Sequence, residues 1–204
     1  MDLIKTNERW RSRLPHWEVD GHWHFVTIRC KDSLPKVALE RILQIYKAMQ
    51  AIDPQHDEFC QLQRQYFLTI EKYLDQGRGR APFRSASACE LCLKALAGLE
   101  KEGWVVAEAT VMPNHIHFLI RRGTSTHSLK EIVKRFKGRS SRWLNQELDV
   151  EGKFWQADWF DRWMRNESEL KRTVDYIRNN PVKAKLVNEW VDYRWRISRD
   201  WVWG

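Results

Sequence analysis

The chain has 204 residues, of which 43% are hydrophobic and 30% are charged, a composition that suits one globular domain with a sizeable core. Its 35 Lys and Arg against 27 Asp and Glu give a formal net charge of +8, which favours a polyanionic partner such as nucleic acid. Without a long apolar run, a signal peptide or a disulfide framework around its four cysteines, the sequence excludes a transmembrane protein, and we expect a cytoplasmic protein with free thiols.

The N-terminal part is expected to lead into a strand and then a helix. Residues 1–16 mix charges, Asn and Pro without a sustained period, which predicts an irregular arm. Residues 22–30 follow Gly21 and are rich in β-branched and aromatic side chains, which predicts a strand. Apolar residues at helical spacing predict a helix over 36–50.

A second helical stretch is expected to interrupt the domain. The pattern predicts a helix over 56–75, and a basic, glycine-rich break at 76–82 follows it. We therefore interpret residues 53–85 as a helical insertion. Leucines and alanines at four-residue steps predict the next helix over 86–101, with Gly103 closing it.

Two cysteines lie within that helix, at Cys89 and Cys92. A CxxC pair is half of a zinc site, but no second pair with suitable spacing follows. Because both cysteines fall in an apolar run, buried free thiols are the better interpretation.

Two strands and a basic helix are expected next. Residues 104–112 and 115–121 are strand-like and are separated by a Pro-Asn turn. Ser128 and Glu131 form a capping box that begins a helix to about residue 147. The charged residues on the face opposite its apolar stripe are almost all positive, which fits either a solvated surface or contact with phosphates. We take the second interpretation for Lys130, Lys134, Arg135, Lys137, Arg139 and Arg142.

The C-terminal third is expected to hold a strand, a helix and a tail. The aromatic run 154–160 predicts a final strand or an aromatic extended segment, and Asn166 is a plausible cap for a helix over 166–180. Beyond it, residues 188–204 form a tryptophan-rich tail. The whole chain is thus interpreted as a single domain over 1–204.

The histidines supply the strongest chemical signal. Residues two apart on a strand project to one face, so His115 and His117 present both imidazoles to the same side and form a potential metal-ligand pair. His22 and His24 have the same spacing, which alone does not separate the two pairs.

The last helix places a tyrosine and an amide together. At about 100° per residue, Tyr176 lies off the apolar stripe, and Asn180 lies roughly 40° from it. A tyrosine in this position is usually a packing residue, so spacing alone does not assign it to catalysis.

Two segments resemble the REP-associated tyrosine transposases, within the HUH single-tyrosine group. They are Met112-Pro-Asn-His-Ile-His-Phe-Leu-Ile120 and Tyr176-Ile-Arg-Asn-Asn-Pro-Val-Lys-Ala-Lys-Leu-Val187. The resemblance extends from about residue 17 to 193. The chain departs from the pattern in the 53–85 insertion and at Lys185, where the family commonly has glycine.

The resemblance implies an α+β fold, with a ferredoxin-like, RRM-related antiparallel sheet and helices packed on it. It also implies that His115, His117 and Asn180 bind a divalent metal, Mg²⁺ or Mn²⁺, and that Tyr176 is the nucleophile. The implied activity is cleavage and joining of single-stranded DNA near palindromic hairpins through a 5′-phosphotyrosine. We then expect a nucleoid-associated protein, either monomeric or homodimeric.

Two rival functions stay open at this point. One is a non-catalytic, RRM-like nucleic-acid-binding protein, whose binding would survive removal of metal. The other is a metal-dependent phosphodiesterase that uses activated water, for which Tyr176 would be dispensable and His115 would not.

Overall fold

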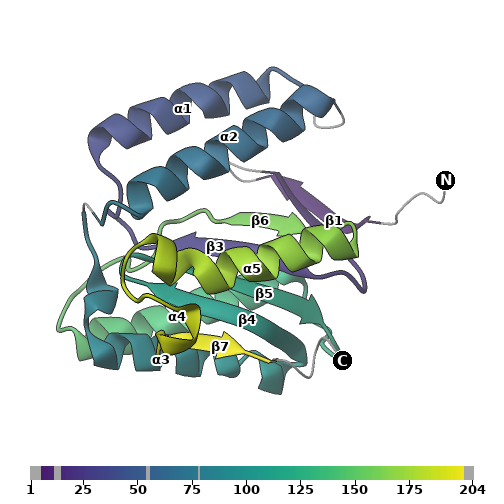
Figure 1. Cartoon of the computed structure of the whole chain (residues 1–204). Helices are drawn as coiled ribbons and strands as arrows, with labels where there is room; N and C mark the ends of the chain where they lie inside the picture. Colours follow the sequence, from purple (N-terminus) through teal and green to yellow (C-terminus); the bar gives the residue numbers. More distant parts are fainter. Residues whose placement is uncertain (1–5, 12–14, 54–55, 78, 200–204) are drawn as a thin grey trace.

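The computed structural model describes residues 6–11, 15–53, 56–77 and 79–199 (Figure 1). Its centre is a five-stranded antiparallel sheet in the order β6-β3-β5-β4-β7. The strands are β3 (His24–Arg29), β4 (Trp104–Met112), β5 (His115–Arg122), β6 (Phe160–Trp163) and β7 (Arg196–Ser198). Counted along the chain, β3 to β6 lie in the order 4-1-3-2, the ferredoxin-like arrangement. The expected α+β fold class is confirmed, and β7 from the tail adds an edge strand.

Helices cover the two faces of this sheet differently. Helices α3 (Ala86–Ala97) and α4 (Leu129–Glu147) lie on one face, and α5 (Glu167–Lys183) lies on the other (Figure 1). Since side chains alternate along β5, Ile116 and Phe118 join the core under α3 and α4, while Leu119 joins Ile177 of α5. His115 and His117 lie four and two residues before Leu119 on the same strand, so their side chains also face α5.

A helical hairpin lies beside α5 on the same side of the sheet. Helices α1 (Lys36–Gln50) and α2 (Asp57–Leu74) pack along each other above β3 and β6 (Figure 1). Phe59 of α2 is fully buried and belongs to the same core as Phe25 and Phe160. The helix predicted within 53–85 is present, but it acts as one arm of a hairpin that also includes α1.

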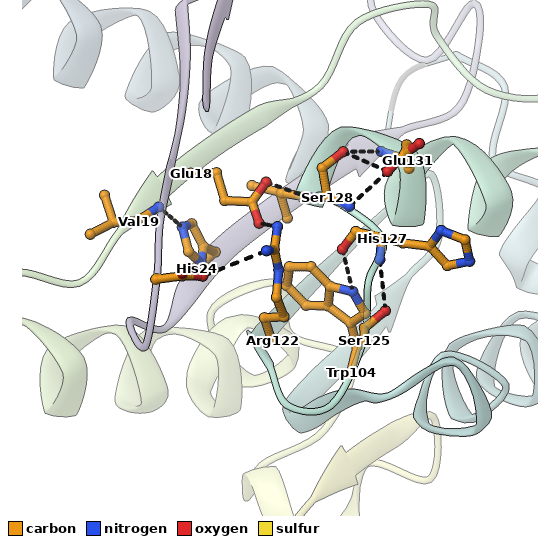
Figure 2. A network of polar contacts seen from close by, with 11 residues as sticks. Glu18, Val19, His24, Trp104, Arg122, Ser125, His127, Ser128 and Glu131 are labelled. Atoms are coloured by element: carbon orange, nitrogen blue, oxygen red, sulfur yellow. Dashed lines mark hydrogen bonds and ion pairs between the residues drawn. The ribbon is translucent and has the colours of Figure 1, made fainter. Parts of the chain in front are cut away.

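The prediction of an irregular N-terminal arm is wrong. Strands β1 (Thr6–Arg11) and β2 (Pro15–Val19) form an antiparallel hairpin. Figure 2 shows one anchor of this hairpin, in which the buried Glu18 carboxylate accepts a hydrogen bond from Arg122. The same carboxylate also accepts a hydrogen bond from the Leu129 backbone N–H at 2.7 Å. A carboxylate is favoured at a helix N-terminus, here that of α4. These two strands were not predicted because they are short and do not alternate clearly between apolar and polar residues.

The other elements follow the predictions with one shift. The capping box of Ser128 and Glu131 begins α4 as expected. Of the two alternatives for 154–160, the structure has the extended segment: Phe154 and Trp155 are buried as core residues, and Trp155 makes only an isolated bridge to Cys30. The strand β6 covers Phe160–Trp163. The aromatic residues at the start of 154–160 therefore pack in the core and do not form a strand.

The cysteines are free, and both Cys89 and Cys92 are buried, as expected. Burial raises the pKa of the Cys89 thiol to about 12 and that of Cys92 well above its ordinary value. Neither thiol is therefore a reactive nucleophile. Within the described part of the chain, no helix is long and apolar enough to cross a bilayer.

Candidate metal and tyrosine centre

The predicted histidine pair forms the floor of a buried site. His115 and His117 of β5 are both 0% exposed, and their Nε2 atoms lie 2.9 Å apart. They lie on the central strand of the sheet, between β3 and β4, so their backbones are held by ladder hydrogen bonds on both sides. This rigid support fixes the direction of both rings.

Neighbouring polar groups orient the imidazoles. The Asn114 Oδ1 atom accepts a hydrogen bond from Nδ1 of His115 at 2.7 Å, while Asn114 Nδ2 donates to the Leu74 carbonyl at 3.1 Å. This arrangement places the proton of His115 on Nδ1 and leaves the Nε2 lone pair free for a cation. Thr27 Oγ1 lies 2.8 Å from Nδ1 of His117 and holds that ring in the same way.

Glu71 of helix α2 completes the group. Its Oε2 atom lies 3.1 Å from Nε2 of His117, and potential ligand atoms of Glu71, His115 and His117 all lie within 4.8 Å of one another. Across the described residues, this is the sole group of three or more His, Cys, Asp or Glu side chains arranged to hold a metal. Glu71 is not among the residues predicted from the sequence, because it lies in the segment interpreted as an insertion.

A signal for Glu71 was nevertheless present in the sequence. It follows Phe67 by four residues and precedes Leu74 by three, so it falls on the inward stripe of α2. A carboxylate at such a position is costly to bury unless it has partners. An acidic residue inside an apolar stripe therefore marked a polar contact across the fold.

Tyr176 meets the group from α5. Its hydroxyl donates a hydrogen bond to Glu71 Oε2, and its ring centroid lies 5.4 Å from that of His117. Burial and then the charge of Glu71 raise the pKa of Tyr176 far above its ordinary value. One turn later, Asn180 is buried close enough to the Tyr176 hydroxyl to affect its pKa, but neither of its amide atoms makes a hydrogen bond of ordinary geometry among the described residues.

The electrostatics suit a divalent cation. Burial, followed by the charge of His117, lowers the pKa of His115 to about 3, so this imidazole is neutral at neutral pH. Burial alone would raise the pKa of Glu71, but its contact with His117 outweighs this effect and holds the pKa below its ordinary value. The site thus combines a neutral nitrogen donor with an anionic oxygen donor.

The spacing of the donor atoms also fits. Two ligands at about 2.1 Å and at right angles on an octahedral cation lie about 3.0 Å apart. The separations are 2.9 Å between the two histidine nitrogens and 3.1 Å between His117 Nε2 and Glu71 Oε2. In addition, Glu71 Oε1 is buried without a hydrogen-bond partner among the described residues. The residues present fit a divalent metal.

The basic residues of α4 lie elsewhere. Because α4 packs against the opposite face of the sheet, nearness in sequence to the histidines does not bring its cations to them. Arg135 and Arg139 both pair with Glu102, and Lys137 donates to two backbone carbonyls at 2.8 and 2.7 Å. Lys130, Lys134 and Arg142 are exposed.

The second histidine pair does not form a site. His22 precedes β3 and lies 2.8 Å, through Nδ1, from the Asp20 carbonyl. His24 is buried, and its Nε2 atom accepts a hydrogen bond from the Val19 backbone N–H at 3.2 Å (Figure 2). This contact uses the His24 lone pair, so its role is to fasten β2 to β3.

Comparison with known proteins agrees with this geometry. Residues 88–180 match the family model described as "Transposase IS200 like". The resemblance to the tyrosine transposases is confirmed. The matched transposase segment contains His115, His117, Tyr176 and Asn180, whereas Glu71 lies outside it.

Two other similar proteins were found, one by sequence and one by structure. An uncharacterized protein from Haemophilus influenzae is 25% identical over 109 residues, which represent 43% of this chain and 59% of that protein. A solved structure of a REP-associated tyrosine transposase bound to a REP hairpin matches 91% of this chain and 82% of that chain, with a TM-score of 0.52 and 13% identity. The second likeness shows a shared fold.

Proposed function

We propose that this protein is a metal-dependent endonuclease and strand transferase for single-stranded DNA, with Tyr176 as its nucleophile. The observation that carries the proposal is the Tyr176 hydroxyl, which is held against a carboxylate that belongs to a buried His-His-Glu group. A tyrosine transposase needs these two components side by side.

His115, His117 and Glu71 would hold the metal, and Asn180 is a further candidate donor because its buried amide makes no hydrogen bond of ordinary geometry within the described chain. Magnesium and manganese are the proposed ions, since carboxylate oxygen suits both and Mn²⁺, as a transition metal, accepts imidazole nitrogen more readily than Mg²⁺ does. Such an ion supplies Lewis-acid polarisation of a phosphate and offsets negative charge in the transition state.

The protein side chains themselves handle the nucleophile and its proton. Free tyrosine is a weak nucleophile at neutral pH. The hydrogen bond from the Tyr176 hydroxyl to Glu71 leaves the Oη lone pairs pointing away from the carboxylate. It also provides an acceptor for the hydroxyl proton when Tyr176 attacks. Attack forms the bond from Tyr176 Oη to phosphorus and breaks the bond to the 3′-oxygen, which leaves as a hydroxyl after taking a proton from water. The 5′-phosphotyrosine keeps the bond energy for rejoining.

DNA binding is proposed from charge and from the structural neighbour. The net charge of +8 favours a polyanion, and the structural neighbour is bound to a REP hairpin. We retain the α4 cations as the proposed DNA-binding surface, on the sheet face opposite Tyr176 and centred on the exposed Lys130, Lys134 and Arg142. A hairpin stem there would be distant from the cleavage point, which suits a single-stranded flank that reaches around to the tyrosine.

A monomer would contain one complete site, because Tyr176 contacts Glu71 and His117 of its own chain. A homodimer is compatible with the same arrangement. We place the proposed activity in the cytoplasm, on nucleoid DNA.

The experiment uses a pool of oligonucleotides, each with a hairpin flanked by random single-stranded segments and a label at the 3′ end. After incubation with Mn²⁺, DNA that stays on the protein through denaturation is recovered and sequenced. We expect labelled protein from the wild-type chain and none from Tyr176→Phe or in EDTA. Cutting by Tyr176→Phe would instead support activated water, and metal-independent binding without any cutting would support a non-catalytic module.

A further inference from the structure

A cavity of about 400 Å³ lies beside the proposed catalytic centre, between the α1–α2 hairpin and the sheet. Helices α1 and α2 form one wall, and β3 with residues 156–160 forms the other. Its volume falls within the usual range of small-ligand pockets. The cavity is therefore large enough for a heterocyclic ligand.

The cavity adjoins the reacting groups directly. Thr27 lines it and also contacts His117 at 2.8 Å. Phe67 lines it too, and its ring centroid lies 5.9 Å from that of Tyr176. Ile70, a third lining residue, precedes Glu71 in α2. A strand whose phosphate lies at Tyr176 would therefore bring a neighbouring nucleotide to this cavity.

The lining has the chemistry of a base-binding site. Aromatic rings come from both walls: Tyr46, Tyr66 and Phe67 from the hairpin, and Trp159 and Phe160 from the sheet side. Flat aromatic walls stack on nucleobases with little dependence on sequence.

Polar groups lie among these rings. Arg29, Gln156 and Asp158 contribute a cation, an amide and a carboxylate, of which Arg29 also contacts Ser33 at 3.5 Å and Asp158 also pairs with His16 at 3.3 Å. Such groups hydrogen-bond the edges of an unstacked base, which is how single strands are read. With Thr27, four hydrogen-bonding residues therefore line the same cavity as five aromatic ones, a combination typical of ligand pockets.

We propose that this cavity receives one unpaired nucleobase next to the scissile phosphate, and that the α1–α2 hairpin thereby selects the cleavage position. The proposal rests on the proposed function and adds a base-specific pocket to it. The hairpin would then have two roles, since α2 supplies Glu71 to the metal group and α1 closes the base pocket. Both helices lie outside residues 88–180, so the pocket combines the hairpin with the transposase segment.

The test fills the cavity without altering the catalytic group. Leu43 lines the cavity and is 50% exposed, so Leu43→Trp should occupy its mouth while the helix stays folded. Val37→Trp is the matched control, because Val37 is 61% exposed on the same helix and lines a different depression. Equal thermal unfolding of both variants and wild type establishes that the fold is intact.

The first measurement is the rate of covalent adduct formation with an oligonucleotide recovered from the selection. We expect Leu43→Trp to slow it roughly 5- to 150-fold, the worth of one stacked base, and Val37→Trp to leave it unchanged. Replacing the flanking nucleotide that enters the cavity by an abasic one should slow adduct formation by the wild-type protein as much as Leu43→Trp does. The same replacement should not slow the Leu43→Trp variant any further. Equal rates for Leu43→Trp and wild type, with no sensitive abasic position, would overturn the pocket and leave the proposed function standing.

A second measurement needs no cleavage. A twelve-nucleotide dT strand with one central 2-aminopurine is titrated with the Tyr176→Phe protein. Stacking of the 2-aminopurine on the aromatic residues of the cavity should quench its fluorescence. The quench should persist with Val37→Trp and disappear with Leu43→Trp. If no adduct ever forms, the proposed function fails, and this titration still decides on the pocket: an absent quench, or one unaffected by Leu43→Trp, rejects it.

Discussion

Replacing Glu71 by Gln should abolish most of the metal affinity. The Glu71 carboxylate is 2% exposed and lies 3.1 Å from His117 Nε2, so the substitution removes the one anionic donor of the group at nearly constant volume. Loss of a supporting group around a bound metal typically weakens affinity about 10- to 100-fold, and loss of a ligand should reach at least the upper end.

The effect can be measured as stability. At a Mn²⁺ concentration about 100 times the wild-type Kd, binding stabilises the folded chain by about 2.7 kcal/mol. A 100-fold weaker Kd leaves about 0.4 kcal/mol at the same concentration. For a chain of this size the difference corresponds to roughly 5–9 °C in Tm. Calorimetry with Mn²⁺ and with EDTA should show this rise for wild type and its near absence for Glu71→Gln.

Asp75→Asn is the matched control. It also converts a carboxylate to an amide at the end of α2, but Asp75 pairs with Lys183 at 2.7 Å and lies outside the group that could hold a metal. It should keep the Mn²⁺-dependent rise. The same rise in Glu71→Gln would refute the assignment of Glu71 as a ligand.

Four further predictions concern other residues of the fold and of the candidate site. Asn114→Ala removes the acceptor that orients His115 and should raise the Kd for Mn²⁺ about 10- to 100-fold in a calorimetric titration; an unchanged Kd would contradict this role. Burial lowers the pKa of His24 from 6.5 to about 4, so the unfolded chain binds the extra proton and stability falls as pH decreases from 6.5 to 4. His24→Gln should remove up to about 3 kcal/mol of that fall in urea titrations, and an unaltered pH profile would show that His24 does not cause it. Lys185 has φ of 58°, so Lys185→Gly should raise stability by about 1 kcal/mol, whereas Lys185→Ala should not. Replacing Lys134 and Arg142 together by Gln should reduce the salt slope of single-strand binding by about 1.4; an unchanged slope would exclude α4 phosphate contacts at these positions.

Much of the candidate metal and tyrosine centre could be predicted from the periodicity of the sequence within single strands and helices. A period of two brought His115 and His117 to one side of β5, and a helical period brought Tyr176 and Asn180 to one side of α5. The departure from glycine at Lys185 likewise corresponds to a left-handed backbone position just after α5. These features depend on neighbours within one element.

Which elements pack against each other, and hence which partners a buried polar side chain meets, was not predictable from the sequence. Glu71 reaches Tyr176 across 105 residues of sequence, and only the packing of α2 against the sheet brings them together. The cations of α4 follow the histidines closely along the chain, yet the alternation of β5 and the crossover of α4 place them on opposite faces. The N-terminal hairpin is held by Glu18, whose partners lie more than 100 residues away.

Mass spectrometry of the trapped protein can identify Tyr176 as the residue that attacks the DNA. After reaction with Mn²⁺ and a selected oligonucleotide, nuclease and trypsin digestion should leave a nucleotide on the peptide of residues 173–178, which contains Tyr176. The account predicts that this peptide alone gains the mass of a 5′-linked nucleotide. A nucleotide found on another peptide, or cleaved DNA without any linked peptide, would contradict it.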